Sequence, residues 1–142
     1  MTRVDFYVLA AGSRGDRYTL ACRLAEKAWQ QGHRVYLHTS SAAESKHLDR
    51  LLWTFRDGSF LPHARHGEAD TRLNPILIGH DATAGGEHDV LINLALQVPD
   101  FFSRFERVVE PLDSSADIRA AGRERYRFYR DRGYPLNNHD IH

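Results

Sequence analysis

Arginines are concentrated near the end of the sequence, in a stretch that has the pattern of a helix. The segment Ile118 to Gly133 contains six arginines and no proline, and Pro135 follows shortly after it. At ~100° per residue, one side of this helix collects the residues that we call the arginine row: Arg119, Arg123, Tyr126, Arg127 and Arg130. Guanidinium groups bind carboxylates or phosphates and stack on flat groups. The row therefore predicts a binding site for an acidic ligand that also carries an apolar or aromatic group.

The two other sides of the same helix indicate how it would sit in the protein. The apolar side carries Ile118, Ala121, Gly122, Phe128 and Tyr129, and the acidic side carries Asp117, Glu124 and Asp131. Because the acids gather on their own side, they are not interleaved as neutralising partners of the row. This favours a binding function over an ordinary solvated helix face. The residues alone leave two ligands open, a disordered acidic peptide and a nucleic acid.

Composition and charge argue against several classes of protein. The 142 residues contain 19 lysines and arginines and 19 aspartates and glutamates, so the formal net charge is zero, which argues against DNA binding as the main activity. The one cysteine, Cys22, excludes an internal disulfide and a cysteine-rich zinc site. The N-terminal apolar run is too short for a signal peptide, and no stretch reaches transmembrane length. We expect a cytoplasmic protein with one domain, residues 1–142, and no membrane contact.

Strand and helix patterns alternate along the chain. The predicted strands are Val4–Leu9, Arg34–His38, Pro75–Ile78, Asp89–Leu94 and Arg107–Glu110, and the predicted helices cover residues 17–31, 41–53 and 118–133. Residues 56–75 are expected to be irregular, and His139 and His142 are expected to lie in a frayed tail. The order predicts an α/β domain with a mainly parallel sheet of about five strands and helices on both faces.

Other patterns that could do chemistry are incomplete. Gly12 and Gly15 follow the first predicted strand, where a dinucleotide-binding fold has its glycine-rich turn, but the full G-x-G-x-x-G is missing. The histidines show no metal-binding spacing on a predicted helix. Asp5, Asp89 and Glu110 lie near strand ends with no base to pair with. We expect no metal, no cofactor and no catalytic site; the alternative is a nucleotide-binding Rossmann-like enzyme that uses the Gly12–Gly15 loop.

Four segments, in register along the chain, together match the sequence pattern of one family. The opening VDFYVL is similar to T-F-Y-L-L, and LAEKAWQQGHRVYLHT is similar to A-x-x-x-W-x-x-G-x-R-V-x-I. The segment LDRLLWTFRDGSFLPH is similar to L-D-x-x-L-W-x-x-x-x-x-S-F-x-P-H, and RERYRFYRDRGYPLN is similar to R-E-R-Y-x-x-Y-x-x-x-G-x-x-L-N. With these motifs the chain resembles the chi subunit of bacterial DNA polymerase III holoenzyme (HolC). Residues 64–88 match this pattern poorly.

The resemblance implies a fold, a function and two binding surfaces. The fold would be a single Rossmann-like three-layer domain without a nucleotide site, and the function that of a non-catalytic subunit of the clamp-loader complex in DNA replication. One surface would bind the acidic C-terminal tail of single-stranded DNA-binding protein (SSB), so that DNA is contacted only indirectly. Its residues would be Leu112, Arg119, Arg123, Tyr126 and Arg127. The other surface would pair with the psi subunit of the clamp loader through Trp53, Phe60, Pro62 and His63.

Overall fold

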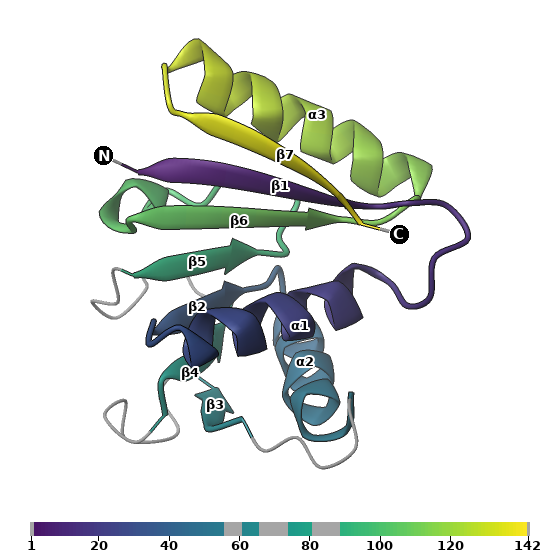
Figure 1. Cartoon of the computed structure of the whole chain (residues 1–142), viewed down its shortest axis with the longest axis vertical. Helices are drawn as coiled ribbons and strands as arrows, with labels where there is room; N and C mark the ends of the chain where they lie inside the picture. The colour runs from purple at the N-terminus through teal and green to yellow at the C-terminus, as the bar shows by residue number, and fades with distance from the viewer. Residues whose placement is uncertain (1, 56–60, 66–73, 81–88, 142) are drawn as a thin grey trace.

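Seven strands form one sheet in the computed structural model, which describes residues 2–55, 61–65, 74–80 and 89–141. The strand order is β3-β4-β2-β5-β6-β1-β7, and neighbouring strands are parallel throughout (Figure 1). The strands are β1 (Arg3–Leu9), β2 (Val35–His38), β3 (His63–Arg65), β4 (Ile76–Gly79), β5 (Val90–Asn93), β6 (Arg107–Leu112) and β7 (Leu136–Ile141). The helices are α1 (Arg17–Gln30), α2 (Ala42–Thr54) and α3 (Ala116–Asp131), with a short 3-10 helix η1 (Phe102–Arg104).

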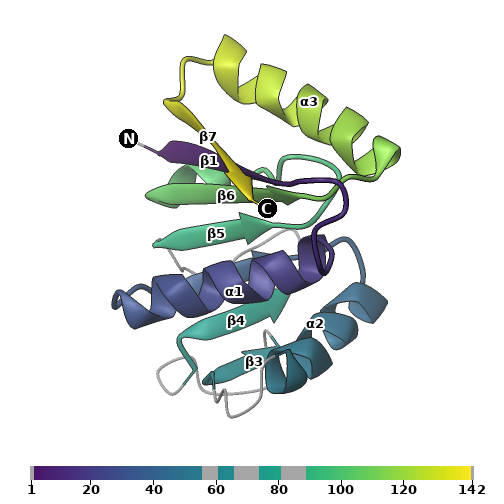
Figure 2. The same cartoon turned by 45° about the vertical axis from the view of Figure 1, so that its right-hand side comes forward.

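Side chains alternate between the two faces of the sheet, and each face has its own core. Val35 and Leu37 of β2 lie in the core formed with α1 and α2. Tyr36, between them, lies in the core formed with α3 and the aromatic residues around η1. Because side chains of successive strand residues point to opposite faces, buried parallel strands are apolar along their whole length. The sheet with helices on both faces confirms the predicted Rossmann-like three-layer α/β fold (Figure 2).

The expected number of strands was too low, because two further strands lie at the edges of the sheet. Strand β3 falls in the segment that was expected to be irregular, and β7 falls in the residues that were expected to be a frayed tail. Each pairs with a strand on one side, β3 with β4 and β7 with β1. The residues of β7 lack the alternation of apolar and polar side chains that identifies a strand. Its structure comes from hydrogen bonds to β1, which is distant in sequence.

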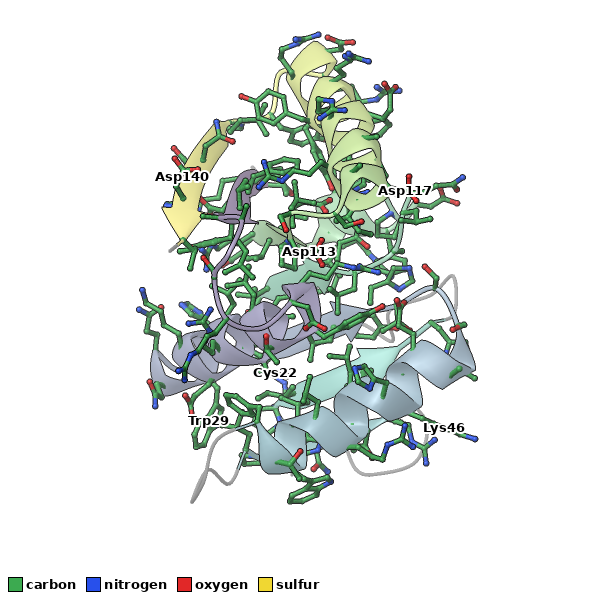
Figure 3. The ribbon with its side chains drawn as sticks, turned by 90° about the vertical axis from the view of Figure 1, so that its right-hand side faces the viewer. Cys22, Trp29, Lys46, Asp113, Asp117 and Asp140 are labelled. Carbon is green, nitrogen blue, oxygen red and sulfur yellow. The ribbon has the colours of Figure 1, made fainter. Side chains whose placement is uncertain are left out.

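Helix α3 ends close to a glycine, and the residue just before its first turn is held by a nearby carboxylate. At its end Gly133 takes a positive φ of 81°, and the Tyr134 N–H donates to the Tyr129 carbonyl at 3.1 Å. At its start Ser115 makes no side-chain capping bond. Instead, the Asp113 carboxylate accepts from the Ser115 N–H at 3.0 Å, and Asp113 lies near the amino-terminal end of α3 (Figure 3).

No helix among the described residues is long and apolar enough to span a membrane.

Candidate functional site on helix α3

Helix α3 lies close to β6 because it has a glycine where the two elements meet. A Cβ built on Gly122 would lie 2.7 and 2.9 Å from the two δ-carbons of Leu112. The resemblance implies that Leu112 belongs to the tail-binding surface, and in the structure this residue is 6% exposed and lies in the core cluster beneath α3. Leu112 therefore packs between α3 and the sheet, and its contact with Gly122 sets how closely α3 approaches β6.

A buried ionic network fixes α3 to the sheet. The Glu110 carboxylate accepts hydrogen bonds from Arg125 Nε at 2.9 Å, Tyr129 Oη at 2.8 Å and Asn93 Nδ2 at 3.1 Å. Both members of the ion pair are buried. Burial raises the pKa of the Glu110 carboxyl above its usual range, and the charge of Arg125 with the three hydrogen bonds opposes that shift. Arg125 also donates from Nη1 to the Leu96 carbonyl at 2.8 Å, so one guanidinium joins α3 to β6 and to the loop after β5.

Arg125 belongs to none of the three sides of the helix that were predicted from the sequence, and this network was not predicted. A signal was present in the spacing: Ile118, Gly122, Arg125 and Tyr129 follow one another by four, three and four residues. That spacing is typical of the side of a helix that faces a core. The carboxylate of Glu110 on the preceding strand is the partner that allows an arginine to be buried there.

The arginine row runs along the side of α3 that borders β1 and β7. Arg119, at one end of the row, donates from Nε to the Asp113 carbonyl at 2.9 Å and from Nη2 to the Leu9 carbonyl at 3.2 Å. These two backbone acceptors hold its guanidinium in place without neutralising its charge. Arg119 is half-buried, so its charge stands at the rim of the sheet where β1 ends.

Tyr126 lies between α3 and β7, and Arg123 lies one turn before it. The Tyr126 ring is half-buried with its centroid 5.2 Å from that of Phe6, and its hydroxyl accepts from Asn138 Nδ2 at 3.5 Å. Arg123 is exposed and has no ion pair among the described residues. A guanidinium without an ion pair in the described part of the chain therefore stands beside a partly exposed aromatic ring, which is the combination that the sequence predicts.

The expectation that the acidic residues of the helix do not pair with the arginine row is wrong for two of its arginines. Arg127 forms an ion pair with Glu124, and Arg130 forms one with Asp131 at 3.1 Å. All four side chains are more than half exposed. Exposed ion pairs of this kind contribute about 0–1 kcal/mol to the free energy of unfolding. An acidic ligand can therefore displace Glu124 or Asp131 from its arginine at little cost.

The second predicted surface lies at the opposite edge of the sheet, on α2 and β3 (Figure 1). Trp53 is 50% exposed, and its ring centroid lies 4.4 Å from that of His63. His63 is itself buried, with its ring nitrogens within hydrogen-bond distance of two backbone carbonyls. Pro62 is half-buried, and Phe60 lies outside the described residues. Among the described residues of the predicted set, Trp53 is thus the exposed side chain and His63 the residue beneath it.

A carboxylate on β1, that of Asp5, also contacts β7. From the sequence it was expected to have no base to pair with. Asp5 accepts from Arg107 Nε at 2.6 Å and lies 3.1 Å from Nε2 of His139. Burial alone would raise the pKa of Asp5, but the hydrogen bonds and charges of Arg107 and His139 outweigh it. The net result is a pKa below the usual value.

Replacing Asp5 with asparagine is expected to lower the free energy of unfolding by about 1–3 kcal/mol at neutral pH, because charge-assisted hydrogen bonds are lost. A carboxyl whose pKa is lowered by folding stabilises the protein above its unfolded pKa, and this contribution is lost as the pH falls through its folded pKa. Urea unfolding should therefore show a difference between wild type and Asp5→Asn that shrinks in acid. The exposed Asp140→Asn serves as the control, and a difference that does not change with pH would contradict the account.

The Gly12–Gly15 loop, on which the alternative nucleotide-binding hypothesis rests, leads into the start of α1. The first N–H groups of this helix are already hydrogen-bonded. Asp16 Oδ1 accepts from the N–H groups of Tyr18 and Thr19, both at 3.1 Å, and Thr19 Oγ1 accepts from the Asp16 N–H at 2.9 Å. The Arg17 N–H points to a carboxylate oxygen of Asp113 at 3.4 Å. A phosphate bound at a helix start needs such N–H groups free. The geometry therefore weighs against a nucleotide at the Gly12–Gly15 loop.

The remaining candidates for chemistry lie apart from that loop. A cavity of about 410 Å³ opens at the carboxyl ends of β2 and β5, between His38 and Phe101, and the Gly12–Gly15 loop is not among the residues that line it. Burial raises the pKa of the Cys22 thiol to about 12, so the thiolate is disfavoured. Within the described ranges, no group of three or more His, Cys, Asp or Glu side chains could hold a metal ion.

The sequence as a whole matches one protein family. The family model described as DNA polymerase III chi subunit, HolC, covers residues 1–137. The DNA polymerase III subunit chi of Pseudomonas aeruginosa is 46% identical over 141 residues, which are 99% of this chain and 98% of that protein. The subunit chi of Escherichia coli (strain K12) is 30% identical over 142 residues, covering 96% and 97% of the two chains. The chain therefore belongs to the DNA polymerase III chi subunit family, and is by that membership a replication accessory subunit.

Proposed function

We propose that the chain is a non-catalytic subunit of the clamp-loader complex that binds the acidic C-terminal tail of SSB on the arginine row. The observation that carries the proposal is the position of Arg123: an exposed guanidinium without an ion pair among the described residues, between the fixed Arg119 and the half-buried Tyr126. It would act in the cytoplasm, at the replisome, and bring the clamp loader to template that SSB covers.

The chemistry of the row suits an extended acidic peptide with an aromatic end. Aspartate side chains and a terminal carboxylate would accept from Arg119, Arg123 and Arg127, and a phenyl ring would lie against Tyr126. The exposed Glu124 and Asp131 would give up Arg127 and Arg130 to the peptide at small cost, since their pairs lie in water. A disordered tail must become ordered as it binds, so the affinity is expected to be moderate and to fall as salt screens the charges.

Replacing Arg123 with alanine tests this site. We expect the affinity for an SSB tail peptide, measured by isothermal titration, to fall about tenfold or more because a charge-assisted hydrogen bond is lost. The control is Arg23→Ala, which removes the same charge from an exposed position on α1. Equal affinities for Arg123→Ala and Arg23→Ala would contradict the proposal, and thermal melting of both variants would confirm that each is folded.

Pairing with a psi subunit is proposed for the surface around Trp53, at the other edge of the sheet. The exposed Trp53 ring, held from beneath by His63, is the kind of aromatic anchor on which protein interfaces depend. Strand β3 is one edge of the sheet, whereas α3 packs on β6 toward the other edge. The two partners would therefore not compete for space.

Replacing Trp53 with alanine is expected to weaken binding to a psi subunit by about tenfold or more. The free energy of unfolding should change by about 1 kcal/mol or less, because half of the residue is already exposed. Co-elution and titration with purified psi subunit provide the measurement. The control is Leu96→Ala, which removes an apolar side chain that is 55% exposed elsewhere on the surface. If both variants bind psi as wild type does, the proposed interface is wrong.

A further inference from the structure

The face of the sheet opposite α3 is covered by helices over only part of its width. Helix α1 contacts β2, β5 and β6, and α2 contacts β3 and β4. Strands β1 and β7 lie beyond both helices on this side (Figures 1 and 2). Parallel sheets are almost always covered on both faces. The open part of this sheet is therefore a surface that a partner could cover.

Three cations surround a small hollow at the border between α1 and this open face. The hollow has a volume of about 170 Å³ and is lined by Arg3 of β1, Lys27 of α1 and Arg107 of β6. No carboxylate is among the described residues that line it. Arg3 and Lys27 are exposed and have no ion pair within the described chain, whereas Arg107 is paired with Asp5. Positive charges gathered at one hollow repel each other unless an anion lies between them.

Part of this arrangement has an ordinary explanation. Lys27 lies in the last turn of α1, where a cation is favoured by the helix dipole. The dipole does not account for Arg3, which comes from a strand on the other side of the hollow. It also does not account for the aromatic residue that lines the hollow between the cations.

That aromatic residue is Tyr7, which lines the hollow and also forms a pair of rings on the open face. The ring of His139 on β7 lies beside it, with centroids 4.4 Å apart and planes at 33°. Arg107 donates from Nη2 to the Tyr7 hydroxyl at 2.6 Å, and its guanidinium carbon lies 5.8 Å from the Tyr7 ring centroid. His139 is an exposed residue, with 43% of its side chain accessible. The open face therefore combines a hollow lined by three cations with an accessible ring.

We propose that this face binds single-stranded DNA directly, with a backbone phosphate in the Arg3–Lys27–Arg107 hollow and a base stacked on His139. Phosphates are bound by clustered cations, and bases without a complementary strand stack on exposed rings. A duplex does not offer a base face to a surface ring, so the arrangement selects a single strand. The site lies on the sheet face opposite α3 and does not depend on the arginine row. It adds a direct contact to the indirect route to DNA through SSB.

The size of the site and the neutral net charge of the chain set the expected strength of binding. Two or three phosphates near the hollow would give a slope of log affinity against log salt of about −1.4 to −2.1. Binding should therefore be weak at physiological salt and measurable at low salt. Such a contact would hold template locally once the subunit is already at the replisome.

The test is the fluorescence anisotropy of a labelled oligothymidine titrated with the full chain at low salt. The double variant Arg3→Gln/Lys27→Gln should bind about tenfold more weakly, because two phosphate contacts are lost. His139→Ala should bind about fivefold more weakly or worse, because one stacked base is lost. The control Arg23→Gln/Lys46→Gln removes the same charge from exposed helix positions and should bind as wild type does.

Four outcomes would overturn the inference. Two are the absence of saturable binding at low salt and an equal affinity of Arg3→Gln/Lys27→Gln and its charge control. The third is a loss of oligothymidine binding in Arg123→Ala, which would place the DNA on the arginine row. The fourth is a loss of SSB tail binding in Arg3→Gln/Lys27→Gln, which would make the hollow a peptide site. Circular dichroism and thermal melting should show that every variant folds. Arg3, Lys27 and Arg123 are exposed, and the backbone pairing of β7 with β1 remains when His139→Ala removes the contact with Asp5.

Discussion

Replacing Arg125 with alanine is expected to lower the free energy of unfolding by about 3–5 kcal/mol, because the Glu110 carboxylate would be left buried without its cation. Glu110 is fully buried, and Tyr129 and Asn93 would remain as its hydrogen-bond donors. Two neutral donors do not replace a guanidinium, so the carboxyl would take up a proton or the helix would separate from the sheet. The effect is large because the same guanidinium also holds the Leu96 carbonyl.

Urea unfolding at neutral pH measures this loss, and Arg123→Ala is the matched control. Both changes remove an arginine from α3, but Arg123 is exposed, so its loss should change stability by about 0.5 kcal/mol or less. The double variant Glu110→Leu/Arg125→Met should be less destabilised than Arg125→Ala, because it removes both buried charges. Similar losses for Arg125→Ala and Arg123→Ala would show that the network does not hold α3.

Replacing Gly122 with leucine should destabilise the protein by up to about 2 kcal/mol, and it should also weaken SSB tail binding. A Cβ at this position would already lie 2.7 Å from a δ-carbon of Leu112, and Leu112 is buried and cannot move into solvent. Overpacking of this kind typically costs about 1–3 kcal/mol, which exceeds the gain of ~1 kcal/mol from removing a helix glycine. The helix would have to move away from β6, and the arginine row would move with it.

The control for this change is Ala120→Leu, at an exposed position of the same helix. It adds a comparable apolar side chain without meeting the sheet, so stability and tail affinity should stay close to wild type. Denaturant unfolding and peptide titration of both variants provide the comparison. If Gly122→Leu were as stable as Ala120→Leu, the close approach of α3 to β6 would not be a constraint on the site.

The layers of the fold could be predicted because its central strands are apolar on both faces. Runs such as Ile76–Gly79 and Val90–Asn93 are buried from end to end, which is the pattern that the sequence analysis recognised. The edge strands could not be predicted in this way. Strand β7 depends on hydrogen bonds to β1 and on the contact between Asp5 and His139, and both come from the far end of the chain.

The sequence could predict which residues make up the candidate site, but not which side chains those residues contact. Helical spacing placed the residues of the arginine row on one side, and the structure confirms that Arg123 is exposed there. The same spacing could not show that Arg127 and Arg130 would turn to acids of their own helix. Spacing alone places Arg125 with Gly122 and Tyr129, but its burial becomes favourable only with Glu110, which lies on another element.

The measurement that tests the account most directly is a titration of the purified chain with a fluorescent peptide ending in Asp-Asp-Ile-Pro-Phe, the SSB tail type, at low and at high salt. We expect saturable binding at low salt, weaker binding at high salt, and a loss of binding when the terminal phenylalanine is removed. The same peptide should bind Arg123→Ala about tenfold more weakly. Absence of binding at low salt, or binding that does not depend on the phenylalanine, would contradict the proposal that the arginine row receives the tail of SSB.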